Sequence, residues 1–243
     1  MAVDFKNEEE VKEYLDNLGI EYRFGCFSEK IHQLLFCLQN SLIFINCCHL
    51  LGDYLEAVKK DYEKAAKVYK NNCDDSSFGK SCYKYGNNLF LGRGVKKNLK
   101  ASLNYYEKGC TGGESFSCLY AGLMYVSNSK TSGEIPKDYK LGMELLQKAC
   151  DKDNPTSCHY LAGMFISGVK DYLETDMTKA FQLSLKACNL GNMYACANVS
   201  RMYKKGDGVK EDLSKYEEFK KKALEMQALL TDAPKNIPFQ QGT

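Results

Sequence analysis

Cysteine is the residue type whose number and spacing in this chain could support chemistry. The 243 residues include twelve cysteines, and eight of them fall into four short-range pairs. The pairs are Cys73 with Cys82, Cys110 with Cys118, Cys150 with Cys158, and Cys188 with Cys196. Paired cysteines can form a disulfide, bind a metal ion or exchange electrons with another thiol. Each chemistry makes a different demand on the surrounding structure.

A disulfide within each pair requires a turn between its two cysteines. Two residues eight apart on one helix would lie about 12 Å apart, whereas bonded cysteines need Cα atoms within roughly 4.4–6.8 Å. The segment from Thr111 to Ser115, with Gly112 and Gly113, supplies such a turn between Cys110 and Cys118. We therefore predict that each pair joins the end of one helix to the start of the next.

Zinc binding and thiol exchange are the rival uses of these cysteines. A zinc site needs four ligands within about 2.3 Å of one ion, but each pair belongs to its own repeat and no C-x-x-C motif occurs. Cys47-Cys48-His49 and Cys158-His159 resemble ligand sets, although adjacent residues rarely aim at one centre. A thiol oxidoreductase needs an exposed thiol of low pKa, for which Cys26 and its neighbours are the candidates. Structural disulfides are the favoured interpretation.

A hydrolase is disfavoured. Ser81-Cys82-Tyr83-Lys84 matches the S-x-x-K motif of penicillin-recognising enzymes, but the companion S-D-N and K-T-G elements are absent. We expect Ser81 to begin a helix instead. The three histidines, His32, His49 and His159, suggest no catalytic triad, so no catalytic residue is assigned.

The second cysteines of the four pairs step along the chain by 36, 40 and 38 residues. A period of this length indicates stacked supersecondary units. Three, four and seven residues beyond each second cysteine stand an apolar, a small and an apolar residue, which trace one face of a helix. We call this the A helix, and the helix that ends at each first cysteine the B helix. The prediction is an all-α array.

Charge argues against a nucleic-acid partner. Lysine and arginine total 33 against 31 aspartate and glutamate, a formal net charge of +2, and no basic face is evident for phosphate binding. We also expect no membrane span.

The cysteine content indicates an oxidising compartment, but the acidic start, Met1 to Glu10, lacks the features of a secretory or matrix-targeting signal. Three explanations are open: a signal missing from this sequence, a reduced cytosolic array, or the mitochondrial intermembrane space. We favour the last, where oxidation of a protein's own cysteines can retain it.

The pattern breaks between Cys26 and Cys48, because 22 residues separate them and residues 31–46 carry no Asp, Glu, Lys or Arg. This uncharged segment could be an extra buried helix, a membrane span, or translated intron sequence; sequencing the transcript would test the last. Spacing does not decide whether Cys47 or Cys48 pairs with Cys26. We choose Cys48 because Gly52 then stands four residues beyond it, the position that holds a small residue after each of the other second cysteines; we call these positions the column of small residues.

Two stretches, Tyr85 to Val95 and Ala101 to Lys108, resemble Sel1-like repeats, a family related to the tetratricopeptide superhelix. The cysteine pairs resemble the disulfide-stapled members first known as cysteine-rich "beta-lactamase-like" proteins. Further stretches resemble mitochondrial members of the family in animals. These are Val3 to Phe5, Asp53 to Glu56, Ala65 to Val68, and Ala195 to Val209.

The resemblance implies a Sel1/TPR-like α-solenoid of about five helix-turn-helix repeats in a right-handed superhelix. It implies a monomeric, non-catalytic scaffold that binds protein partners during assembly of respiratory-chain complexes, chiefly cytochrome c oxidase (complex IV) and also complex I. No cofactor or metal is expected. The alternative is a thiol-disulfide reductase, or a haem- or copper-handling factor, that acts on copper chaperones of the oxidase.

The predicted organisation is an N-terminal helix in residues 1–25, a solenoid over 26–230 that contains the apolar insertion 31–46, and a disordered tail at 231–243. A C-terminal helix from Leu213 to Leu230 should cap the array. A fifth disulfide, Cys26–Cys48, completes the set. The predicted protein-binding residues are Asn87, Asn88, Tyr125, Phe165, Arg201 and Tyr203.

Overall fold

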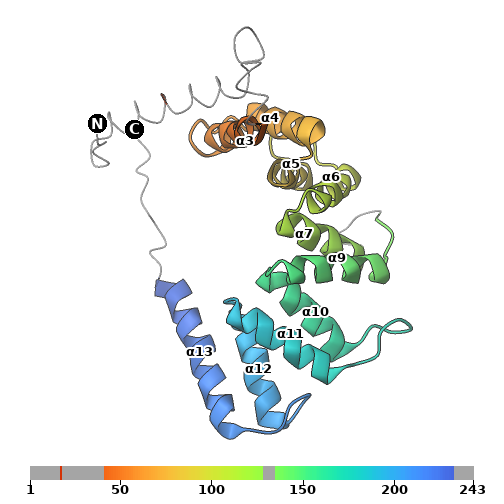
Figure 1. Cartoon of the computed structure of the whole chain (residues 1–243), viewed down its shortest axis with the longest axis vertical. Coiled ribbons are helices and arrows are strands. Elements are labelled where there is room, and N and C mark those ends of the chain that lie inside the picture. The colour runs from red at the N-terminus through yellow and green to blue at the C-terminus, as the bar shows by residue number, and fades with distance from the viewer. Residues whose placement is uncertain (1–16, 18–40, 128–134, 233–243) are drawn as a thin grey trace. The chain divides into compact units, whose positions relative to one another are not determined.

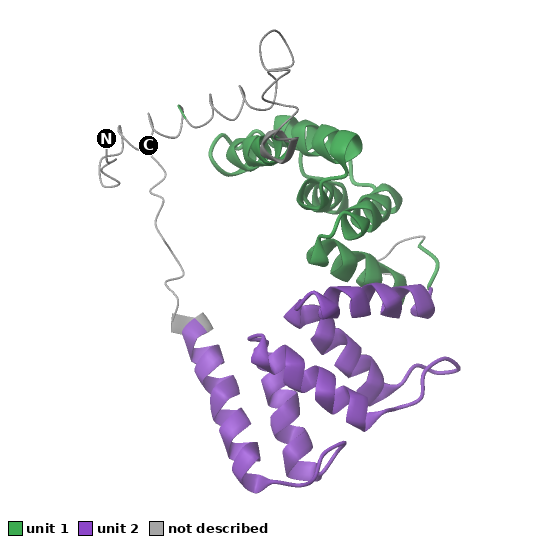
Figure 2. Ribbon diagram, viewed as in Figure 1, with its two compact units in different colours: residues 1–137 green, residues 138–243 purple. Residues whose placement is uncertain are grey.

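The computed structural model describes residues 17, 41–127 and 135–232. These residues form ten α-helices, and the only β interaction among them is an isolated bridge between Val169 and Leu173 (Figure 1). The predicted all-α class is confirmed. The helices group into two compact units, residues 1–137 and 138–243 (Figure 2).

Unit 1 contains five described helices that follow the predicted alternation. The A helices are α3 (Ser41–Ala57), α5 (Gly79–Leu91) and α7 (Ser115–Val126), and the B helices are α4 (Tyr62–Ser76) and α6 (Leu99–Thr111). Each helix packs against the next one along the chain, and α5 also contacts α7. The A helices α5 and α7 of successive repeats are therefore neighbours.

Unit 2 continues the same alternation. Its B helices are α9 (Tyr139–Asp151) and α11 (Met177–Asn189), its A helices are α10 (Pro155–Ser167) and α12 (Met193–Lys205), and α13 (Leu213–Asp232) follows. Consecutive helices again pack together. The helix α13 matches the predicted C-terminal helix and continues two residues further, to Asp232.

Short polar side chains begin most of these helices. The B helices start after Asp61, Asn98, Asp138 and Asp176, and in each case the side chain accepts a hydrogen bond from the backbone N–H three residues later. Asn154 and Asn192 do the same at the start of α10 and α12. Each cap satisfies a backbone donor that the helix itself cannot pair.

The glycine-containing turns after α5 and α12 close the helices and also fit against the preceding B helix. Gly92 and Gly206 adopt left-handed backbone angles immediately after α5 and α12, as expected for helix termination. Gly94 and Gly208 also have positive φ, and an added Cβ would collide with the carbonyl oxygens of Tyr62 and Met177, respectively. Each turn therefore lies on the first residue of the preceding B helix, which requires glycine.

The core face predicted for the A helices is confirmed for the residues three beyond each second cysteine. These apolar residues are all at most 8% exposed: Leu51, Tyr85, Ala121, Leu161 and Val199. Of the residues seven beyond, Leu89 and Tyr203 are buried, whereas Leu55, Tyr125 and Phe165 are half-buried. The column of small residues has a second function besides the predicted close approach of helix backbones. A Cβ on Gly86 would lie 2.8 Å from the ring of Tyr106, and Gly52 faces the ring of Tyr69 in the same way. Glycine at these positions makes room for a buried tyrosine of the B helix.

Part of the uncharged segment belongs to the fold. Residues 41–46 form the first turns of α3, and the Ile45 carbonyl accepts a 2.9 Å hydrogen bond from the Asn72 amide. No helix in the described part of the chain is long and apolar enough to cross a membrane. Residue 17 is the one described residue of the predicted N-terminal helix, and it is helical. Residues 231 and 232, predicted to begin the disordered tail, belong to α13 instead. The rest of the N-terminal helix, the remainder of the insertion and residues 233–243 lie outside the described residues.

Candidate functional site

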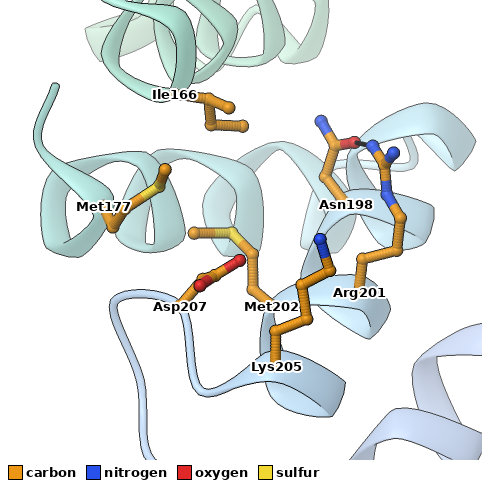
Figure 3. A pocket seen from close by; sticks show the side chains of 7 residues that line it. All are labelled: Ile166, Met177, Asn198, Arg201, Met202, Lys205 and Asp207. Carbon is orange, nitrogen blue, oxygen red and sulfur yellow. Dashed lines mark hydrogen bonds between the residues drawn. The ribbon is translucent and has the colours of Figure 1, made fainter.

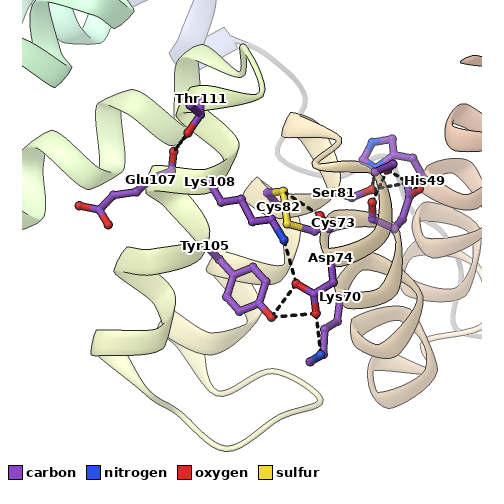
Figure 4. Close-up of a disulfide and its surroundings, with 12 residues drawn as sticks. His49, Lys70, Cys73, Asp74, Ser81, Cys82, Tyr105, Glu107, Lys108 and Thr111 are labelled. Atoms are coloured by element: carbon purple, nitrogen blue, oxygen red, sulfur yellow. Dashed lines mark hydrogen bonds and ion pairs between the residues drawn. A yellow bond between two sulfur atoms is a disulfide. The ribbon is translucent and has the colours of Figure 1, made fainter.

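Four disulfides join consecutive helices, and they are the four regular pairs that the spacing predicts. They connect α4 to α5, α6 to α7, α9 to α10, and α11 to α12, with Cα–Cα distances of 4.6 to 4.8 Å. Figure 4 shows the Cys73–Cys82 bond between α4 and α5. All eight cysteines are at most 2% exposed. Because a thiol or thiolate must reach a disulfide to exchange with it, these bonds are built as structural links.

A fifth disulfide starts from α3. Cys48 is disulfide-bonded and buried, whereas Cys47 carries a free, half-buried thiol. Cys48 is therefore the bonded member of the adjacent pair. Cys26 and Cys37 lie outside the described residues, so the Cys26–Cys48 bond stays a prediction.

The interpretation that the histidines form no triad-like set is corrected at His49. Its Nδ1 atom lies 3.1 Å from Ser81 Oγ, and its Nε2 atom lies 3.5 Å from Asp53 Oδ2. Ser81 is 0% exposed and also accepts a 2.8 Å hydrogen bond from Asn72. A nucleophile must touch its substrate, so this serine cannot act as one. The Ser81–His49–Asp53 contact ties α5 to α3.

A charged network continues outward from Asp53. The Tyr69 hydroxyl donates to Asp53 at 2.6 Å and to Glu56 at 3.1 Å, and the Lys84 ammonium group lies 3.0 Å and 3.1 Å from the same two carboxylates. Burial would raise the pKa of Asp53, but the Tyr69 hydrogen bond, His49 and Lys84 hold it below its ordinary value. Burial would likewise lower the pKa of Lys84, but Asp53 and Glu56 raise it. The lysine of the S-x-x-K motif is therefore committed to an ion pair.

The six predicted protein-binding residues are distributed over both units and differ in exposure. Asn88 and Tyr203 are only 4% and 7% exposed, and Tyr203 stacks on Phe219 of α13. Asn87 is half-buried and accepts a hydrogen bond from Tyr106. These three residues support the packing of the repeats.

The other three predicted binding residues are more accessible. Tyr125 is half-buried and donates to Glu107 at 2.5 Å. Phe165 lies under the Lys179 ammonium group, 5.4 Å from the ring centre. Arg201 is exposed and donates to the Asn198 side chain. Arg201 is the predicted residue best placed to meet a partner.

Arg201 also lines a pocket in unit 2, which we call the Arg201 pocket (Figure 3). Its volume is about 130 Å³, well below the roughly 300–1,000 Å³ of typical small-molecule sites. The lining residues come from α10, α11, α12 and the turn after α12: Ile166, Met177, Asn198, Arg201, Met202, Lys205 and Asp207. A hollow of this size suits one side chain of another polypeptide. Sequence reasoning found only Arg201, because the other residues converge through packing.

The described residues contain no group of three or more His, Cys, Asp or Glu side chains that could hold a metal ion. The Arg201 pocket supplies basic, thioether and amide groups and a single carboxylate.

Alternating helices that repeat every 36 to 40 residues, with a disulfide between repeats, define an α-solenoid protein. The chain belongs to the Sel1 repeat family, whose sequence pattern matches residues 45–69, 79–114, 116–154, 155–192 and 194–215. These matches follow the helix pairs seen in the structure.

Curated relatives are similar over almost the whole chain. A Drosophila melanogaster protein named cytochrome c oxidase assembly factor 7 homolog is 46% identical, and the match covers 100% of this chain and 98% of the relative. Proteins named cytochrome c oxidase assembly factor 7 from Xenopus tropicalis and Danio rerio are 38% and 37% identical, with 98% and 92% of this chain covered and 97% and 93% of the relatives.

Solved structures agree on the fold. A protective antigen of uropathogenic Escherichia coli, described as displaying an SLR fold, matches with a TM-score of 0.68 and 20% identity, covering 90% of this chain and 48% of that protein. A Sel1 repeat protein from Oxalobacter formigenes matches with a TM-score of 0.64 and 22% identity, covering 73% of this chain and 68% of that protein. At these identities the likeness concerns the fold alone.

Proposed function

We propose that this protein is an assembly factor for respiratory-chain complexes, chiefly cytochrome c oxidase (complex IV) and in addition complex I. The observation that carries the proposal is the 46% identity, over the entire chain, to a protein named for cytochrome c oxidase assembly. The match spans both units, so the similarity is not that of one shared repeat.

The proposed mode of action is that of a non-catalytic, monomeric scaffold. The regular disulfides are buried, and the triad-like serine is buried as well. Several large aromatic side chains are exposed on A helices instead, with Phe116, Tyr160 and Tyr194 at 48%, 46% and 63% exposure. Aromatic residues and arginine are enriched in protein–protein interfaces, so these residues and Arg201 support a protein-binding role.

The proposed location is the mitochondrial intermembrane space. The relatives' names concern a mitochondrial enzyme complex, and five disulfides require a compartment that permits thiol oxidation. Protease treatment of intact mitochondria and of mitochondria with ruptured outer membranes tests this location. The protein should be protected in the first sample and degraded in the second. Protection in both samples would place it in the matrix and contradict the proposal.

Loss and restoration of the protein test its function. Cells of the source organism that lack the protein should contain less fully assembled cytochrome c oxidase on native gels, and the wild-type chain should restore it. Complex I measured on the same gels tests the wider role. Normal amounts of assembled oxidase in the deficient cells would overturn the proposal.

One observation supports a second candidate, a thiol-disulfide reductase that acts on partner proteins such as copper chaperones. Cys47 is a free thiol directly beside the bonded Cys48. A Cys47 thiolate would attack one sulfur of a partner's disulfide, form a mixed disulfide and release the other sulfur as a thiolate, and a thiol reductant such as glutathione would then resolve the mixed disulfide. The variant Cys47→Ser separates the two candidates. A scaffold should still restore the oxidase with this variant, whereas a reductase that attacks through Cys47 should not.

A further inference from the structure

The two cations at the Arg201 pocket have no carboxylate partner among the described residues. Neither Arg201 nor Lys205 forms an ion pair with any residue in that part of the chain. Figure 3 shows both side chains extending in the same direction from α12. Asn198 accepts a hydrogen bond from Arg201 and thereby fixes the position of the guanidinium group. Two basic groups thus point to the same side of α12.

The wall of the pocket opposite these cations is mainly apolar. It is formed by Ile166 at the end of α10, Met177 at the start of α11, and Met202 on α12. Methionine side chains adapt readily to irregular apolar groups. Asp207 contributes the single carboxylate, so the charged lining carries a net excess of one positive charge. The pocket therefore complements a side chain with an aliphatic stem and a carboxylate head.

The surface continues beyond the pocket between α10 and α12. Tyr194, Asn198, Arg201 and Lys205 are spaced by four, three and four residues, so they lie along one face of α12. The rings of His159 on α10 and Tyr194 on α12 are 6.1 Å apart. We call the surface from these two rings to the Arg201 pocket the α10/α12 surface.

Gly163 and His159 define the α10 side of this surface. Gly163 lies four residues after His159 and three before Ile166, on the same face of α10, and an added Cβ there would meet nothing within 4 Å. Burial lowers the pKa of His159 below 6.5, so the ring is neutral at neutral pH and adds no charge. The cations that line the pocket, Arg201 and Lys205, therefore gain no further charge from His159.

We infer that the α10/α12 surface binds an extended, acidic segment of a partner protein, with one carboxylate between Arg201 and Lys205. The aliphatic part of that acidic side chain contacts Ile166, Met177 and Met202, and the chain continues past Gly163 toward Tyr194. The inference rests on the proposed protein-binding function and specifies the chemistry of the bound segment.

Selection from a random peptide library tests this chemistry while the partner is still unidentified. Peptides of about ten residues extend over about 33 Å, enough to follow one helix face. The purified full-length protein should enrich peptides that contain glutamate or aspartate beside apolar residues. Enrichment of sequences without acidic residues, or no enrichment at all, would overturn the inference.

Charge reversal then tests the location. An enriched peptide, labelled with a fluorophore, should bind the variant Arg201→Glu/Lys205→Glu about tenfold or more weakly than wild type. The matched control is Lys170→Glu, an exposed lysine in the turn after α10, which should change affinity by less than about twofold. A carbodiimide, which couples carboxylates to amines, should link the peptide to Lys205. Equal binding by both charge variants would place the peptide elsewhere.

Gly163 supplies a steric test that does not depend on charge. Gly163→Leu adds a side chain to open space on the proposed path, so the protein should fold normally but bind the peptide about tenfold or more weakly. Gly163→Ala makes the same backbone change with little added bulk and should bind nearly as wild type. Unimpaired binding by the leucine variant would exclude the segment from this path.

Peptide binding and oxidase assembly are separate readouts. If the peptide results hold but cells without the protein assemble the oxidase normally, the assembly function fails and the binding site remains. If Arg201→Glu/Lys205→Glu restores the oxidase as well as wild type, the Arg201 pocket is not the seat of the functional partner, while the assembly role remains.

Discussion

The Tyr69 hydroxyl illustrates how single residues hold unit 1 together. The residue is 0% exposed, fills the space left by Gly52, and donates to both Asp53 and Glu56. Burial and these carboxylates raise its pKa far above the ordinary value, so the hydroxyl keeps its proton. One phenol thus joins α4 to the last turns of α3.

Replacing Tyr69 by phenylalanine measures how much these hydrogen bonds contribute to the stability of the fold. The variant keeps the ring but removes the phenol donor from two carboxylates that Lys84 still contacts, so we expect the free energy of unfolding to fall by about 1.5–3 kcal/mol. Chemical denaturation followed by circular dichroism measures the change. Tyr105→Phe is the control, since its hydroxyl contacts Asp74 at the surface and should contribute less than about 1 kcal/mol. Equal effects would contradict this account.

Two histidines, the buried His49 and the half-buried His159, predict how stability depends on pH. Burial lowers the pKa of His49 below 6.5, with Asp53 opposing and Lys84 adding to the shift, and burial also lowers that of His159. The unfolded chain therefore binds more protons in this range, so stability should decrease as the pH falls below 6.5. Thermal unfolding between about pH 7.5 and 5.5 measures this. His49→Gln/His159→Gln should show a weaker dependence, and an unchanged slope would refute the assignment.

At the scale of elements, the glycine turn after α12 is a packing surface as well as a helix end. Gly208 has a φ of 70° and sits against the Met177 carbonyl oxygen. Gly94 repeats the arrangement against Tyr62 in unit 1. Each repeat is thereby placed in register with the one before it.

Substituting Gly208 with alanine should therefore destabilise unit 2. The left-handed backbone costs about 1–2 kcal/mol for a non-glycine residue, and the collision with Met177 adds to it. Gly163→Ala, in the open helix position, should instead leave stability unchanged or raise it by up to about 1 kcal/mol. Melting temperatures of the two variants provide the comparison. A Gly208→Ala protein as stable as wild type would show that the turn is not constrained.

Removing one regular disulfide tests the stapling of helix pairs. Cys150→Ala/Cys158→Ala avoids leaving a buried hydroxyl and should lower the free energy of unfolding by about 2–3 kcal/mol, as expected for a loop of this length. Cys47→Ala removes the free thiol instead and should cost less than about 1 kcal/mol. Denaturant titration without reductant measures both. If the Cys150→Ala/Cys158→Ala variant is as stable as wild type, the bond between these cysteines does not stabilise the fold.

At the scale of the whole molecule, the number of free and bonded cysteines tests both the fold and the proposed location. Twelve cysteines less five bonded pairs leave two, of which Cys47 is free and Cys37 is predicted to be free. Alkylation of unfolded, unreduced native protein should therefore modify two cysteines, and peptide mapping should recover Cys26 linked to Cys48. Alkylation of most of the twelve would contradict both the stapled fold and the intermembrane space.

Local periodicity made much of this fold predictable. The columns of apolar and small residues located the helix faces, and residues such as Gly92 and Gly206 marked helix ends, because these signals lie within a few residues of each other. Pairing of Cys73 with Cys82 followed from spacing for the same reason. The end of α13 was predicted within two residues.

Contacts between distant residues were not predictable in this way. Ser81 and His49 are 32 positions apart, and only the packing of helices around α3 brings them together. The His49/Asp53 spacing of four was the one available signal. The Arg201 pocket likewise needs α10, α11 and α12 at once. Of the predicted binding residues, Asn88 and Tyr203 are buried, and Tyr203 packs on Phe219 of α13, a contact that local spacing does not show.

The short span of each bridge has a consequence for how the chain can mature. The two partners are only 8 or 9 positions apart in every regular pair. If the chain enters the intermembrane space unfolded, as the proposed location implies, both sulfurs of a pair emerge almost together. Each hairpin can be oxidised before the next arrives, and mispairing with distant sulfurs is disfavoured by the larger loops it would need to close. Under the proposed location, retention would proceed one repeat at a time, while the remainder of the chain is still in transit.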